Sequence, residues 1–340
     1  MASANNKNHT IELLRFIFAV LIILYHSYQY LFARQDLLIF KHSYLGDEFF
    51  FIVSGFFIAN SVFKSNLQKS NWEILRSRFT TIKWPYYISW LGAFVGLNLV
   101  SDLETLLGNL LHSIPELCFI DMCGFKEGFY ANPVAWYVSA LFLTVVITVP
   151  IIKRYGLSFC YYCAPVLSLM FYGILNLNYD VLNAPHQIMF GFIHKGLVRC
   201  FAGCFAGFFI FSLTKESSIK IWLDNHLRVA SLFQMLSFIL VIMYCVSPIE
   251  NSYDFSVVVL MIVFLSITMI CNPNENIVKK IPFVLKLGRF SVYMFLGQAV
   301  FYAVLHNVVE FRCCNIVWLP LYFDKLLVGG INSSKLQKNH

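Results

Sequence analysis

The sequence predicts an all-α fold, a polytopic integral membrane bundle of nine or ten transmembrane helices. Apolar residues make up 59% of the 340 residues and charged residues only 13%, about half the share that is usual in soluble proteins. The mean hydropathy is +0.68. Apolar runs of membrane-spanning length follow one another, and most of the Lys and Arg residues fall between them. These three observations place the chain in a lipid bilayer.

The apolar runs are roughly 17–24 residues long, which is the length that an α-helix needs to cross the hydrocarbon core. The first run is too long for the core of a signal peptide and is followed by no small-residue cleavage site, so we expect a retained span. Asp324 and Lys325 interrupt the tenth run. The predicted spans are at about 11–33, 45–63, 84–100, 135–152, 157–176, 194–213, 229–247, 254–271, 287–309 and 313–330.

The charges between the runs predict the orientation. The segments after the second, fourth, sixth and eighth runs are basic, whereas the loop at 101–134 is acidic. Because basic loops stay on the cytoplasmic side, we expect a cytoplasmic N-terminus and, after ten spans, a short cytoplasmic tail at 331–340. The net charge of +7 then reflects membrane anchors, and we expect no nucleic-acid partner. Pairing of Cys118 with Cys123 in the outer loop is the less favoured alternative to free thiols.

The first span contains two ionisable residues, Arg15 and His26. Eleven residues are close to three helical turns, so both side chains lie on one face, about 16 Å apart along the axis. Alone, Arg15 would be taken as an interfacial anchor. An ionisable group such as His26 within a span usually faces a cavity or the bundle interior. A permanent cation suits a phosphate-bearing ligand, and an imidazole suits proton transfer.

Three further positions are candidates for lining a site. Glu48 begins the second span at a depth similar to that of His26, where it can orient the imidazole or end the loop as an interfacial acid. Ser54 offers a hydroxyl, and Gly55 more simply allows close packing. Arg199 is a charge within the sixth span, but Gly203 and Gly207 of the same span form a GxxxG pattern typical of helix packing. No residue spacing predicts a metal site.

Two of these patterns together resemble the acyltransferase-3 family, bacterial membrane proteins that mostly O-acetylate carbohydrates. The first is an arginine, ten residues and a histidine, here Arg15 and His26. The second is G-x-[DE]-x-F-F-x-x-S-G-F, matched at 46–56. Weaker matches are Trp136 in the signal W-[YF]-[LIV] at the start of the fourth span, and Arg199 in the sixth.

Two more segments extend the resemblance from the first span to the ninth. Arg76, Arg78 and Lys83 precede a Pro-Tyr entry to the third span, as in the family. The ninth span resembles G-x-x-S-[YF]-x-[IL]-Y-L-x-H from Gly288 onward, but Gln298 stands where many members have His. This departure argues against a catalytic role for the ninth span.

The resemblance implies that residues 1–330 form a membrane acyltransferase domain in the bacterial cytoplasmic membrane. It implies acetyl-CoA or another acyl-CoA as donor, and a hydroxyl of a surface polysaccharide or lipid-linked sugar as acceptor. We expect Arg15 and the basic residues at 76–83 to hold the donor phosphates, with anchoring to anionic lipid as the alternative. His26 would act as general base or accept the acyl group transiently, and Glu48 would orient it.

Two other functions remain open at this point. A secondary transporter of a sugar or small organic anion would place Arg15, His26 and Arg199 along its path, but no internal repeat is visible in the sequence. A scaffold subunit without activity would fit the departure at Gln298.

Overall fold

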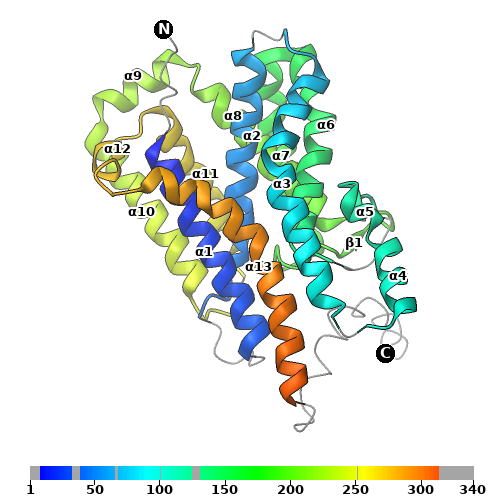
Figure 1. The fold of residues 1–340 in the computed structure, drawn as a ribbon. Coiled ribbons are helices and arrows are strands. Elements are labelled where there is room, and N and C mark those ends of the chain that lie inside the picture. The colour runs from blue at the N-terminus through cyan, green and yellow to red at the C-terminus, as the bar shows by residue number, and fades with distance from the viewer. Residues whose placement is uncertain are drawn as a thin grey trace, which may run out of the picture.

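The computed structural model describes residues 8–32, 39–65, 68–99, 101–124, 131–250 and 252–313. It confirms a polytopic all-α architecture of long helices packed side by side (Figure 1). Beyond residue 313, the predicted tenth span and the predicted tail at 331–340 lie outside the described residues.

Nine long helices correspond to the first nine predicted spans. They are α1 (His9–Phe32), α2 (Gly46–Lys64), α3 (Asn71–Leu97), α6 (Ala135–Ser158), α7 (Ala164–Asn178), α8 (Lys195–Leu213), α10 (Leu227–Val246), α11 (Asp254–Ile270) and α13 (Val284–Cys313). Among the described residues, length and composition qualify six segments as membrane-spanning: α1, η2 with α2, α6 with α7, α8, α10 and α13. Helix α11 is apolar but shorter.

Short elements connect the long helices. The predicted outer loop at 101–134 contains α4 (Leu103–His112), α5 (Ile114–Leu117) and η3 (Asp121–Cys123), and both Cys118 and Cys123 are free thiols. The others are η2 (Ser43–Leu45), the π-helical turn η4 (Phe159–Cys163), α9 (Ser217–Asn225), α12 (Glu275–Val278) and an antiparallel pair of β1 (Ile188–Met189) and β2 (Ile193–His194).

Helix α3 begins well before the predicted third span. Ser70 is its N-cap: the Ser70 hydroxyl accepts a hydrogen bond from the Glu73 backbone at 3.1 Å, and Glu73 Oε2 accepts one from the Ser70 backbone at 2.6 Å. This capping box stabilises the first turn. These hydrogen bonds also hold the pKa of the exposed Glu73 carboxyl below its ordinary value. The basic residues at 76–83, predicted to lie in a loop, are therefore helical.

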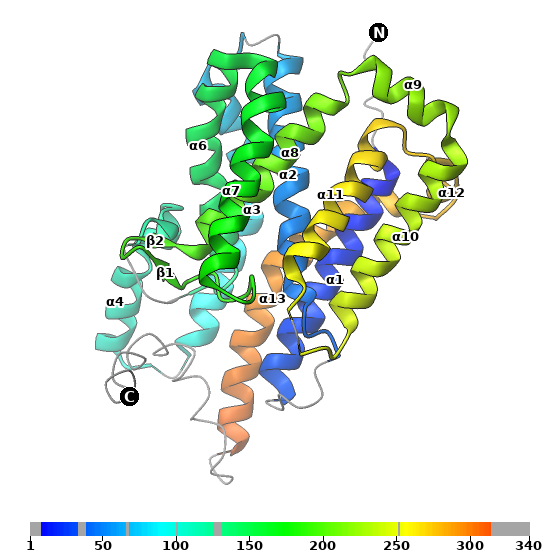
Figure 2. The ribbon, with the colours of Figure 1, turned by 180° about the vertical axis from the view of Figure 1, so that it is seen from behind.

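The predicted fourth and fifth spans form a helical hairpin. Gly156 has φ 62° and ψ −145°, a conformation that residues with a Cβ rarely adopt, and it reverses the chain between α6 and α7. The views from both sides show α6 and α7 as neighbours of α8 (Figures 1 and 2).

Helices α2 and α8 form the most closely packed pair. Gly55 lies against the Cys204 backbone, and Gly207 lies against the Ile52 carbonyl, so that a Cβ at either glycine would meet main-chain atoms. The backbones can approach this closely because neither glycine has a side chain. The GxxxG pattern of the sixth span and Gly55 of the second thus pack against each other, as their residue types predict.

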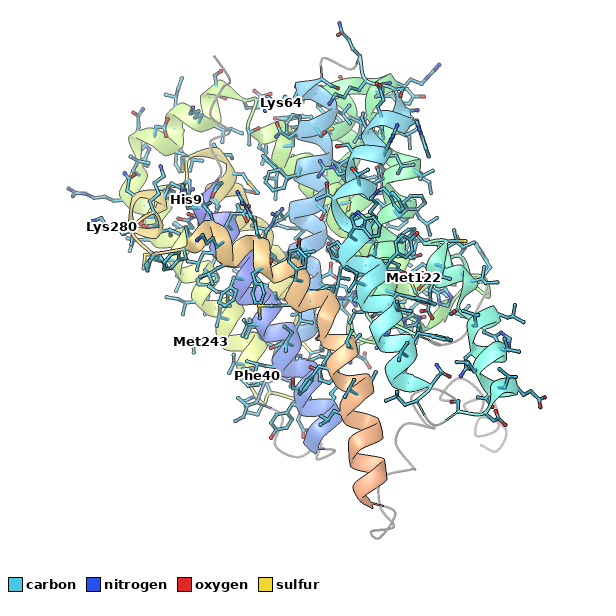
Figure 3. All side chains as sticks on the ribbon, in the orientation of Figure 1. His9, Phe40, Lys64, Met122, Met243 and Lys280 are labelled. Atoms are coloured by element: carbon cyan, nitrogen blue, oxygen red, sulfur yellow. The ribbon has the colours of Figure 1, made fainter. Side chains whose placement is uncertain are left out.

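One end of the bundle carries several lysines. Lys64 and Lys280 lie toward the end where α1 begins, whereas Phe40 and Met243 lie toward the other (Figure 3). The Lys153 ammonium donates to the Lys69 carbonyl at 2.9 Å, which joins the α6–α7 hairpin to the start of α3 at the same end. We call this the basic end.

The start of α1 is held by α12. Glu275 accepts hydrogen bonds from the backbone N–H groups of His9 and Thr10 at 3.0 and 3.2 Å. Burial raises the pKa of Glu275, but the hydrogen bonds from His9 and Thr10 outweigh it, so this pKa lies below its ordinary value. A carboxylate here also compensates the positive end of the α1 dipole.

Candidate active site

Helix α1 is continuous over 24 residues, so Arg15 and His26 lie about 16 Å apart along its axis, as their spacing predicts. Helix α1 begins at the basic end (Figure 1), so Arg15, in its first half, lies nearer to that end than His26, in its second half. Both side chains are only partly buried.

Gln298 of α13 is a hydrogen-bond partner of His26. The Nδ1 atom of His26 lies 3.0 Å from Oε1 of Gln298. The amide nitrogen of Gln298 donates to the Phe295 carbonyl at 2.8 Å, and Gln298 is buried. The rings of Tyr25 and Tyr302 lie beside the imidazole, with centroids at 5.3 and 6.5 Å.

Glu48 belongs to a different network. Its Oε1 accepts from Nε of Arg199 at 2.7 Å, and its Oε2 accepts from the Tyr172 hydroxyl at 2.5 Å. Glu48 therefore bonds to residues of α8 and α7. The side chain that contacts His26 in its place is Gln298. The sequence placed Glu48 and His26 at similar depths, but depth does not specify the side of the helix from which a side chain projects.

Arg199 is the centre of this second network. It is 1% exposed, its Nη2 lies 3.8 Å from Oδ2 of Asp47, and its guanidinium carbon lies 5.5 Å from the centre of the Trp136 ring. Arg199 and Trp136, both predicted to line the site, therefore meet around Glu48. A buried arginine needs such partners because an unpaired charge in this environment is costly.

An aromatic cluster packs beside the His26–Gln298 pair. Phe50 of α2, Tyr137 of α6 and Phe295 of α13 have ring centroids 5.4–6.3 Å apart. The Ser54 hydroxyl lies 3.3 Å from the Tyr137 hydroxyl, which places Ser54 at this cluster. Phe295 is also the residue whose carbonyl holds Gln298, so the cluster reaches the His26 pair.

The predicted phosphate-binding residues divide into two groups. The Arg15 guanidinium lies 5.3 Å from the centre of the Phe57 ring, and Arg78 donates from Nη2 to the Phe57 carbonyl at 2.5 Å, so both converge on one residue. Arg15 also pairs with Glu12 at 3.3 Å. Arg76 is exposed, and the Lys83 ammonium lies 5.2 Å from the ring of its neighbour Trp84.

A family model described as an acyltransferase domain matches residues 8–323, nearly the whole chain. The chain belongs to the acyltransferase-3 family. No curated protein and no solved structure shows significant similarity to it. The polytopic helical fold and this membership together identify a membrane acyltransferase.

Sequence reasoning missed three residues of the two networks in this acyltransferase. Tyr172 and Asp47 complete the surroundings of Arg199, but a tyrosine in a span and an acid beside Glu48 carry no distinguishing pattern. Gln298 did have a signal, because it stands where many family members have histidine. Among the residues that the structure describes, no three His, Cys, Asp or Glu side chains are grouped so as to hold a metal ion.

Proposed function

We propose that this acyltransferase moves an acetyl group from acetyl-CoA to a hydroxyl of a surface polysaccharide or lipid-linked sugar in the bacterial cytoplasmic membrane. The observation that carries the proposal is that α1 bears two groups of polar residues at different points along its length. Arg15 meets Arg78 at Phe57, and His26 meets Gln298 further along the same helix. A coenzyme A thioester also has phosphates at one end and the acyl group at the other.

The basic end of the bundle supports a cytoplasmic N-terminus. Lys64, Lys153, Lys215 and Lys280 lie in or beside the segments that join helices at this end, and basic residues there are retained on the cytoplasmic side. The donor would then enter from the cytoplasm, and His26 would lie toward the outer half of the membrane. An acceptor on the outer side would meet the acyl group there.

Arg15 and Arg78 suit the phosphates of the donor. A guanidinium presents several N–H donors in a fixed plane and keeps its charge at any physiological pH. Charge-assisted hydrogen bonds to phosphate are about twice as strong as neutral ones. Arg76 and Lys83 stay weaker candidates, because their described contacts do not join the Phe57 group.

His26 would act at the reacting atoms. As general base, it takes the proton of the acceptor hydroxyl while the oxygen attacks the thioester carbonyl; the carbon–sulfur bond breaks and the thiolate leaves with the electron pair. As nucleophile, the imidazole first forms an acyl-imidazole, which the acceptor then attacks. Both routes need an imidazole nitrogen with a lone pair. Glu48 would act at a distance, by holding α2, α7 and α8 together.

The experiment compares surface glycans from cells with and without this gene by mass spectrometry. We expect a mass difference of one acetyl group on the glycan, and release of free coenzyme A thiol from acetyl-CoA by the purified chain in nanodiscs. Transport of labelled sugar across vesicles without thiol release would instead support the transporter. Absence of both would support a scaffold subunit, and either result would contradict the proposal.

A further inference from the structure

The side-chain amide of Gln298 has a defined orientation. One of its ends lies 2.8 Å from the Phe295 carbonyl oxygen, which can only accept a hydrogen bond. That end is therefore the NH2 group. The carbonyl end, Oε1, is the atom left facing Nδ1 of His26 at 3.0 Å.

The orientation of the amide fixes the proton on His26. An amide oxygen has no hydrogen to donate, so Nδ1 of His26 must be the donor. A neutral imidazole carries one proton on its two ring nitrogens. With that proton on Nδ1, the lone pair is on Nε2.

The surrounding contacts hold this geometry in place. Tyr302 lies one turn beyond Gln298 on α13, and its hydroxyl donates to the Ile23 carbonyl of α1 at 2.9 Å. The Ser27 hydroxyl lies 2.8 Å from the Tyr302 hydroxyl, whose proton is already directed to Ile23, so Ser27 is the donor. These bonds attach α13 to α1 on both sides of His26 in the sequence. The imidazole and its amide partner therefore belong to two helices that are held together by hydrogen bonds.

We propose that Gln298 is a positioning residue that holds His26 as the Nδ1–H tautomer, so that Nε2 is the atom that takes the proton of the acceptor or the acyl group. This inference rests on the proposed function for the step that Nε2 performs. The tautomer itself does not depend on that function.

An amide partner also differs in charge from the acidic partner that the sequence predicted. A carboxylate beside an imidazole favours the imidazolium form, whereas a neutral amide adds no charge. The described groups near the His26 ring include Tyr25 of α1 and Tyr302 and Gln298 of α13. Holding His26 through an amide orients the ring without placing a negative charge beside it.

The first test measures the tautomer directly. The full chain in nanodiscs, with ¹⁵N in the histidine rings, is compared by NMR with His26→Ala and His26→Gln to identify the His26 signals. We expect a protonated Nδ1 and an unprotonated Nε2 at a pH where the ring is neutral. In Gln298→Leu the preference for Nδ1–H should weaken. A protonated Nε2 in the wild-type chain would overturn the proposal even if acetyl transfer were confirmed.

The second test measures kinetics on the same preparations. Gln298→Leu should lower kcat about 10- to 100-fold without changing the KM for acetyl-CoA, as expected for loss of an orienting partner. The nearly isosteric Gln298→Glu should move the acid limb of the pH–rate profile to higher pH, because it favours the imidazolium. A matched control is Gln234→Leu, which removes from α10 a buried amide that is bonded to Thr268 of α11 and to Asn274.

Three outcomes are distinguishable. Loss of kcat in Gln298→Leu but not in Gln234→Leu, together with the shifted limb in Gln298→Glu, supports the positioning role. Wild-type kcat and an unshifted profile in both Gln298 variants would contradict it. If the wild-type chain transfers no acetyl group, the proposed function fails, and the NMR measurement still decides the tautomer.

Discussion

Two helix interfaces differ in what they bury. Between α2 and α8, glycines bring the backbones together, and the Glu48–Arg199 ion pair is enclosed, at 0% and 1% exposed. Between α1 and α13, the partner of His26 is an uncharged amide, and His26 is partly accessible. Arg15, further along α1, keeps 29% of its side chain exposed. The first interface encloses its charged groups, and the second leaves its polar groups partly accessible.

The difference shows that a charge inside a span is not by itself evidence of a catalytic residue. Arg199 and Glu48 are more buried than His26, and they pair with each other. Substitutions at the α2–α8 interface should therefore reduce stability first, and substitutions on α1 should reduce activity while the fold persists. The predictions below test this division.

The largest effect is expected for His26→Ala. Loss of a general base typically costs about 10²- to 10⁴-fold in rate, so acetyl transfer should fall by at least about 100-fold. The thermal midpoint should stay near that of the wild type, because the lost hydrogen bond is to a neutral amide. The exposed His226→Ala is the control. Normal transfer in His26→Ala would show that α1 does not carry the chemistry.

Arg199→Met should cause the next largest loss, and this loss is one of stability. Removing one partner of a buried ion pair costs about 3–5 kcal/mol, because Glu48 is left unpaired. The measurement is thermal unfolding in detergent, with the exposed Arg154→Met as control. The double variant with Glu48→Gln should lose less than the sum of the two single variants. Additive losses would mean that the pair does not stabilise the α2–α8 interface as described.

Gly207→Ala tests the backbone packing itself. The added Cβ would meet the Ile52 carbonyl, so we expect a loss of about 1–3 kcal/mol, typical of overpacking. Gly173→Ala in α7 is the matched control, since its Cβ would meet no atom within 4 Å and alanine is the better helix former. Equal stability of the two variants would contradict the close approach of α2 and α8.

Arg15→Ala and Arg78→Ala should raise the KM for acetyl-CoA about 10-fold each, the scale of one hydrogen bond to a charged group. Their kcat should change less, because both residues lie away from His26. Lys280→Ala, an exposed cation at the same end, should leave KM unchanged. An unchanged KM in both arginine variants would remove their donor-binding role.

The smallest effect is expected at the start of α1. The lowered pKa of Glu275 means that its stabilisation is present at neutral pH and is lost as pH falls through that value. Glu275→Gln should therefore be less stable than the wild type at pH 7 by about 0.3–1 kcal/mol, typical of a charge at a helix N-terminus. The two proteins should converge in stability at acid pH. A constant difference across the pH range would mean that the carboxylate charge is not responsible.

The sequence by itself determined the membrane class, the first nine spans to within a few residues at most boundaries, and the places where small residues allow close packing. The length of an apolar run and the size of a residue are local properties, so they can be recognised directly in the sequence. The start of α3 was missed, because the capping box at Ser70 makes a polar segment helical. The spacing of Arg15 and His26 likewise follows from helix geometry alone.

Only the tertiary structure decided which partner each polar residue has. Glu48 was expected at His26 and is bonded to Arg199. Gln298 was expected to argue against a catalytic role for the ninth span, and it is hydrogen-bonded to His26. Both results depend on how each helix is rotated about its axis and which helix packs beside it. Contacts between α1 and α13 join residues 272 positions apart, and no local pattern specifies such a pairing.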